Sequence, residues 1–220
     1  MSAHIRILSL LLLLALGAQA QDKPYAFAVK VGPSLSNTAF VHNGNRIATQ
    51  WAPSVFVGVG GQFDFSSLLG LEADVLLLTK GHRLHNVGVF TGQEHNDRFG
   101  SLHIDVPINL KVGFDLSPNL RAYAQAGPYI SMAIQSVMWI TEEHADGSLL
   151  TSNHYPDALG YSLWHSLKRF DLGINAGLGL LLNRHYQVGL VYYHGLLNQA
   201  KPAADKLKHR MMCLELGYWF

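Results

Sequence analysis

His103 and Asp105 come closest to a catalytic arrangement in residue type and spacing. They are two positions apart, so in an extended strand both side chains point to the same face. A histidine beside a carboxylate is the arrangement that activates the serine of many hydrolases. No serine lies in a motif diagnostic of such a nucleophile. An ion pair of Asp105 with Lys111 or Arg121 accounts for the same residues, and we predict no catalytic residue.

Histidine is unusually frequent, with 12 in 220 residues. His82 and His85 are close enough in sequence to share a metal ion, and His95 falls in the same predicted loop. No carboxylate or cysteine partner stands at a spacing typical of a metal site. We therefore interpret the loop histidines as surface residues and predict neither a metal nor another cofactor. They are His42, His82, His85, His95, His144, His154 and His165.

Charge is scarce in this chain. Asp, Glu, Lys and Arg make up 14% of the residues, against about 25% in an average soluble domain. The formal net charge of +1 argues against binding to nucleic acid through phosphate neutralisation. The single cysteine, Cys213, excludes a disulfide within the chain.

Residues 1–20 have the pattern of a secretory signal peptide. His4 and Arg6 precede an apolar run over residues 7–16, which is too short to span a bilayer. Ala18-Gln19-Ala20 is typical of a cleavage site. We predict a mature domain of residues 21–220, and the alternative is an uncleaved anchor.

Apolar and polar residues alternate with period two in eight segments, which predicts strands rather than helices. Each strand has about ten residues, the length that crosses a bilayer at a tilt. The segments are 25–32, 54–65, 69–80, 102–114, 120–130, 170–182, 186–194 and 212–220.

The connections alternate strictly between short and long. The short ones are 66–68, 115–119 and 183–185, and the long ones are 36–53, 81–101, 131–169 and 195–211. This alternation is typical of outer-membrane barrels with tight periplasmic turns and larger external loops. We predict an all-β fold, an eight-stranded antiparallel up-and-down transmembrane β-barrel with both chain ends on the short-turn side.

Three features favour lipid on the apolar face over a soluble barrel of lipocalin type. The opposite face carries charges of both signs, it is rich in glycine, and aromatic residues of the apolar face gather at the short-turn ends. Lys30 and Asp64 lie on the polar face, and Phe56, Tyr123, Tyr129, Tyr193 and Trp219 point inward, as does Cys213. An eight-stranded barrel is just wide enough for side chains to fill it. The predicted lumen charge network is Glu72, Asp74, Lys80, His103, Asp105, Lys111, Arg121, Asp171 and Glu215.

The third long connection holds most of the loop aromatics. Residues 137–140 are expected to extend the preceding strand. Residues 142–147 are typical of a turn, so the chain is expected to fold back there as a β-hairpin. The aromatic side chains either contact a protein or glycan or pack over the barrel mouth. These binding candidates are Trp139, Tyr155, Tyr161 and Trp164.

The mature chain resembles the PorT-like outer-membrane β-barrel proteins of Bacteroidetes, often labelled porin family proteins. The segments that carry the resemblance are, in chain order, 31–33, 71–74 with 80–81, 102–111, 126–129, 170–173 and 214–220. The last is similar to the aromatic-ended strand read by the barrel-assembly machinery, with Tyr218 and Phe220 as the signal. The resemblance implies the fold and the location only, because most family members have no assigned activity.

Three functions remain open from the sequence. The first is a non-enzymatic outer-membrane barrel, in contact with outer-membrane lipid, with a structural role or a binding role through its loops. The second is a narrow passive channel, and the third is an enzyme at the external rim that hydrolyses lipid or protein.

Overall fold

The computed structural model describes residues 25–84, 96–143, 149–153, 167–201 and 205–220. Within these ranges no helix is long and apolar enough to cross a membrane. The strands are β1 (Tyr25–His42), β2 (Asn45–Ile47), β3 (Ala52–Asp64), β4 (Leu69–Leu84), β5 (Asn96–Ser117), β6 (Leu120–Glu143), β7 (Leu149–Asn153), β8 (Phe170–Leu182), β9 (Tyr186–Gly195) and β10 (Lys206–Trp219).

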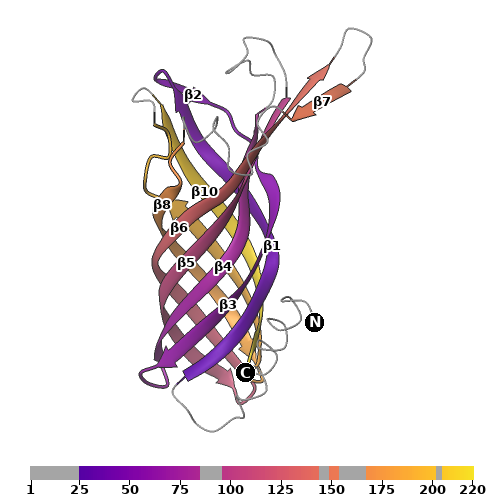
Figure 1. Ribbon diagram of the computed structural model, residues 1–220. Coiled ribbons are helices and arrows are strands. Elements are labelled where there is room, and N and C mark those ends of the chain that lie inside the picture. Colours follow the sequence, from indigo (N-terminus) through magenta and orange to yellow (C-terminus); the bar gives the residue numbers. More distant parts are fainter. Residues whose placement is uncertain (1–24, 85–95, 144–148, 154–166, 202–204) are drawn as a thin grey trace, which may run out of the picture.

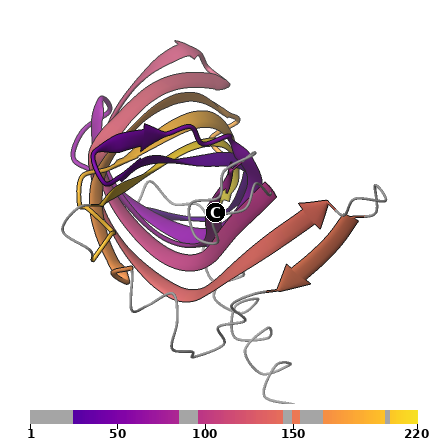
Figure 2. The same ribbon diagram turned by 90° about the horizontal axis from the view of Figure 1, so that it is seen from above.

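Eight of these strands close into an antiparallel barrel (Figures 1 and 2). Neighbours in the sheet follow the order β1, β3, β4, β5, β6, β8, β9 and β10, and β10 pairs with β1 to close it. The closing pair runs from Ala28 opposite Trp219 to Val41 opposite Lys206. β2 pairs with β1 and β7 with β6 outside this ring. The predicted fold class is therefore confirmed.

β5 shows how the period-two pattern positions the two faces. Ile104, Ile108 and Leu110 are exposed on the outside of the barrel, whereas Asp105 and Asn109 are fully buried inside it. Side chains on successive residues of a strand point to opposite faces. The same alternation holds along β9, where the odd-numbered residues from Gln187 to Tyr193 are buried.

The three short turns all lie at one end of the barrel, which also holds Tyr25 and the C-terminus (Figure 1). Exposed aromatic side chains surround that end, as the sequence pattern predicts, and they contact one another in pairs such as Phe63 with Phe65 and Tyr186 with Tyr218. The exposed members of this aromatic belt are Tyr25, Phe27, Phe63, Phe65, Phe114, Tyr186 and Tyr218.

The strands are longer than predicted at the long-loop end. β5 has 22 residues and β6 has 24, and β1 continues through Ser36 to His42, into a segment predicted as loop. Outside a membrane neither face of a strand must be apolar, so the alternation fades before the strand ends. The predicted hairpin is present, because β6 pairs with β7 from Trp139 opposite Asn153 to Glu143 opposite Leu149. It projects beyond the barrel wall (Figures 1 and 2).

His82 corrects the interpretation of the loop histidines. We expected it at the surface, but it lies in β4 and only 5% of it is exposed. β4 continues to Leu84, so His82 keeps the inward parity of Asp74 and Lys80. His85 and His95 lie outside the described residues.

Candidate functional site

Lys30 is the centre of an inner charge cluster in the lumen. Its ammonium Nζ lies 2.5 Å from Glu72 Oε1, 2.8 Å from Asp74 Oδ2 and 2.9 Å from Glu215 Oε1. The four side chains come from β1, β4 and β10 and are at most 4% exposed. A lysine buried this deeply is tolerable only with close anionic partners. The ion pair of Lys30 with Glu215 therefore joins β1 to β10, the two strands whose pairing closes the barrel.

Lys111 extends the inner cluster toward the short-turn end. Its Nζ lies 2.6 Å from Glu72 Oε2 and donates to Gln187 Oε1 at 3.2 Å. The ammonium also lies 4.1 Å from the ring centre of Tyr123 and 4.9 Å from that of Trp219, distances typical of cation–π contacts. Trp219 Nε1 donates to Gln187 Oε1 at 2.6 Å. Aromatic rings and an amide thus fill the lumen beside the charges.

Lys80 is the centre of an outer charge cluster nearer the long loops. Its Nζ lies 2.7 Å from Asp105 Oδ2 and donates to Ser131 Oγ at 3.0 Å. Asp105 therefore pairs with Lys80, and the expected partners Lys111 and Arg121 are wrong. The parity of the strands places all these residues inside, but the register between strands decides which of them meet. Asp171, which accepts from Tyr129 at 3.4 Å, also belongs to this level.

A serine–histidine contact lies within the outer cluster. Ser101 Oγ is 2.7 Å from His103 Nε2, and His103 Nδ1 is 3.0 Å from Ser131 Oγ. Sequence reasoning missed this contact because Ser101 lies in no recognised motif, although it shares the inward parity of His103. The second ring nitrogen faces a serine rather than the carboxylate of a catalytic triad. Ser101 and His103 are at most 4% exposed, so both are shielded from substrate.

An apolar layer separates the two charge clusters. Along β4 the buried side chains follow in the order Glu72, Asp74, Leu76, Leu78 and Lys80. Leu76 and Leu78 pack in one cluster with side chains from four other strands, β3, β6, β9 and β10. The members of this cluster are Phe56, Leu76, Leu78, Tyr129, Val191, Tyr193, Met211 and Cys213. The lumen therefore consists of three stacked layers, ionic, apolar and ionic.

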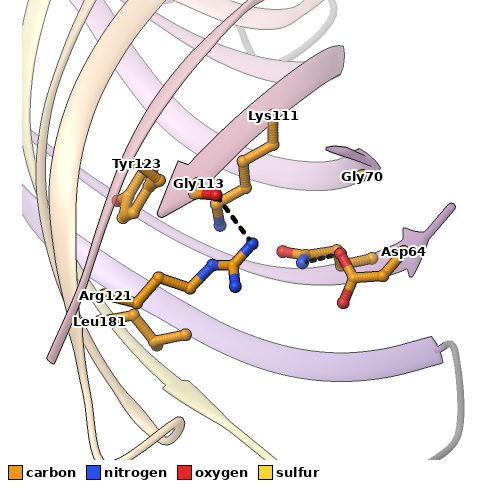
Figure 3. A pocket seen from close by; sticks show the side chains of 8 residues that line it. Asp64, Gly70, Lys111, Gly113, Arg121, Tyr123 and Leu181 are labelled. Atoms are coloured by element: carbon orange, nitrogen blue, oxygen red, sulfur yellow. Dashed lines mark hydrogen bonds between the residues drawn. The ribbon is translucent and has the colours of Figure 1, made fainter. Parts of the chain in front are cut away.

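Arg121 lies apart from both clusters, at the short-turn mouth. Its guanidinium donates to the carbonyl of Gly113 at 3.2 Å and to that of Ser67, and lies 3.4 Å from Asp115. Arg121 and Lys111 reach toward a pocket of about 20 Å³ between them, opposite Asp64 (Figure 3). This volume has room for about one water molecule. Below it the mouth widens into a bowl of about 850 Å³.

Lys30 was predicted on the polar face but was not included in the predicted lumen charge network. Its sequence signal was present, because Lys30 shares the inward parity of Ala28 and Gly32 in the first strand. The predicted assembly signal lies at the short-turn end, where Tyr218 contacts Phe220 with ring centres 5.1 Å apart. Trp139 lies in β6, but its side chain is outside the described structure, as are the whole of Tyr155, Tyr161 and Trp164.

Solved outer-membrane proteins resemble this chain in outline. OprG from Pseudomonas aeruginosa is 13% identical with a TM-score of 0.48, and the match covers 90% of this chain and 97% of OprG. Ail from Yersinia pestis, in complex with the heparin analogue sucrose octasulfate, is 12% identical with a TM-score of 0.43 and coverages of 89% and 99%. Neisserial surface protein A is 9% identical with a TM-score of 0.42 and coverages of 87% and 96%.

No curated protein matches the chain. The family assignment comes from a family model described as "Outer membrane protein beta-barrel domain", which matches residues 8–220. That match covers all eight strands of the closed barrel. The chain belongs to this family of outer-membrane β-barrel proteins.

Proposed function

We propose that this protein is a non-enzymatic outer-membrane barrel with a closed lumen, which holds its long-loop end at the cell surface for a structural or binding role. The observation that carries the proposal is the stack of three lumen layers. An ion crossing the barrel must disrupt the ion pairs of Lys30 and of Lys80, and between them it must pass the apolar side chains around Leu76 and Leu78. An unpaired charge in such surroundings costs several kcal/mol, which argues against a passive channel.

The long-loop end is the part of the molecule best placed to bind a partner. Rigid scaffolds commonly present binding residues on loops, and the β6–β7 hairpin extends the barrel wall outward (Figure 1). Trp139, Tyr155, Tyr161 and Trp164 are the proposed contact residues. Their aromatic character suits a protein or a glycan.

A hydrolase is the alternative favoured by one contact, between Ser101 and His103. Both side chains are buried within the outer cluster, and His103 Nδ1 faces Ser131. A nucleophile must reach its substrate at about 3 Å, and burial at this depth prevents it. The non-enzymatic role is therefore the one we propose.

The finer family and the route of export are part of the same proposal. The chain is proposed to be PorT-like, supported by the order of its motifs and above all by residues 102–111. Residues 1–20 serve as a cleavable signal peptide, so that the mature chain starts at Gln21. Tyr218 and Phe220 in the last strand are read by the barrel-assembly machinery. No role in protein secretion is proposed.

Planar-bilayer recording tests the closed lumen. The full mature chain, folded and inserted into phospholipid, is expected to pass no steady current in 1 M KCl, because the ionic and apolar layers fill the lumen. Insertion is checked by gel migration, with and without boiling, of the same phospholipid preparation of the protein. A steady, salt-dependent conductance from inserted protein would overturn the proposal in favour of a narrow channel.

A further inference from the structure

The bowl at the short-turn end has the size of a ligand site. Its volume is about 850 Å³, and small-molecule sites typically occupy about 300–1,000 Å³. Residues of all three short turns line it, together with Trp219 and Phe220 at the C-terminus. The bowl lies at the opposite end of the barrel from the long loops, so it is separate from the proposed surface function.

Two tight turns of this chain differ at one informative position. The β1–β2 turn has Asn43 at φ 47° and Gly44 at φ 83°, and the β8–β9 turn has Asn183 at φ 51° and Arg184 at φ 60°. Asn183 and Arg184 are the central residues of a β-turn that the His185 N–H closes by donating to the Leu182 carbonyl at 3.0 Å. A β-turn with positive φ at both central positions favours Asn-Gly, because glycine adopts this conformation without steric cost. An L-residue such as arginine is strained there, because its Cβ comes too close to the following carbonyl oxygen. Arg184 therefore has a backbone conformation that disfavours any residue with a Cβ atom. Such backbone strain is often found at functional sites.

Arg184 is also available to a ligand. Within the described residues it makes no ion pair, in contrast to Arg121, whose guanidinium is occupied by Ser67, Gly113 and Asp115. The neighbouring His185 is fixed, because its Nδ1 lies 2.8 Å from the carbonyl oxygen of Trp219 and its ring stacks on Tyr218. Arg184 thus stands on a rigid turn at the rim of the bowl.

A basic and an acidic side chain face each other across the bowl. Arg184 comes from the β8–β9 turn, and Asp64 comes from the end of β3, beside the β3–β4 turn. In the closed order of eight strands these two turns are four places apart, and so lie across the mouth from each other. Asp64 Oδ1 accepts from Gln62 Nε2 at 2.6 Å, which orients the carboxylate. Arg121 and Asp115 also line the bowl but pair with each other at 3.4 Å. Among the described residues of the lining, Arg184 and Asp64 are therefore a cation and an anion without an ion pair, on opposite sides of the mouth.

We propose that the bowl binds a short peptide with free ends, whose terminal carboxylate pairs with Arg184 and whose amino group pairs with Asp64. An arginine guanidinium matches a carboxylate with two parallel hydrogen bonds. Short turns of outer-membrane barrels face the periplasm. Two sources there offer a peptide with both ends free: ordinary short peptides, and stem peptides that have been detached from the glycan of the cell wall.

Isothermal titration of the full folded chain in detergent tests the site with tetra-alanine as the probe. Tetra-alanine with free ends is expected to bind, and amidation of its C-terminus is expected to weaken binding about tenfold through loss of the charged pair. Arg184→Gly is expected to weaken the binding of free tetra-alanine about tenfold and to leave the affinity for the amidated peptide unchanged. Glycine fits the turn, so this variant folds. Asn183→Gly changes the same turn without removing a charge and is expected to bind like the wild type.

Asp64→Asn with N-acetylated tetra-alanine makes the matching test of the acidic side chain. Tighter binding of an isolated wall tetrapeptide than of tetra-alanine would assign the site to the cell wall, and equal binding would assign it to free peptides. No binding of either peptide, equal binding of free and end-blocked tetra-alanine, or unchanged binding in Arg184→Gly would each overturn the proposal.

Discussion

Replacing Lys30 by methionine is expected to lower the free energy of unfolding by about 3–5 kcal/mol, the cost of breaking a buried ion pair by removing one partner. Asp74 and Glu215 lose the cation that lies within 3 Å of each, and both remain buried. The measurement is reversible urea unfolding in phospholipid vesicles, and the folded fraction is read from gel migration without boiling.

Two further variants show whether charge rather than packing causes this loss. Adding Asp74→Asn to Lys30→Met removes one of the carboxylates left without a cation, and it is expected to recover part of the lost stability. Lys206→Met changes an exposed lysine at the start of β10 and is expected to alter stability by less than about 0.5 kcal/mol. Equal effects of Lys30→Met and Lys206→Met would show that the inner cluster does not stabilise the barrel.

Ile108→Arg is the second variant with a large expected effect. Ile108 lies on the outward face of β5, between the buried Pro107 and Asn109. An arginine at the bilayer midplane of a barrel costs about 2–4 kcal/mol, and the cost falls to about 0–1 kcal/mol near the interface. Ile108→Arg is therefore expected to destabilise the barrel by about 2–4 kcal/mol in the same urea assay.

Leu116→Arg is the matched control on the same strand. Leu116 is also exposed but lies beside the short turn that follows β5. Its replacement is expected to cost about 0–1 kcal/mol. If the two arginine variants were equally stable, the outward face around Ile108 would not contact the hydrocarbon of a bilayer.

Period two predicted the strands, because a membrane-spanning strand must keep one face apolar over its whole width. The alternation of short and long connections and the charges on the polar face then predicted the membrane barrel. The parity that put Asp105 inside β5 also places Lys30 inside β1. The pairing of Asp105 with Lys80 was beyond the sequence, since it depends on the stagger between β4 and β5 rather than on either strand. The full length of β6 was also missed, because outside the bilayer the pattern is no longer constrained. The strain at Arg184 is a property of φ and has no counterpart in composition or spacing.

Collision of nitroxide labels with oxygen along β5 tests the arrangement of the two faces most directly. In a Cys213→Ser background, labels are placed singly at positions 103 to 111 of the chain folded in phospholipid. Oxygen accessibility is expected to be high at Ile104, Val106, Ile108 and Leu110 and low at His103, Asp105, Asn109 and Lys111. High accessibility at the charged positions, or no alternation along the strand, would contradict a barrel with lipid outside and ion pairs within.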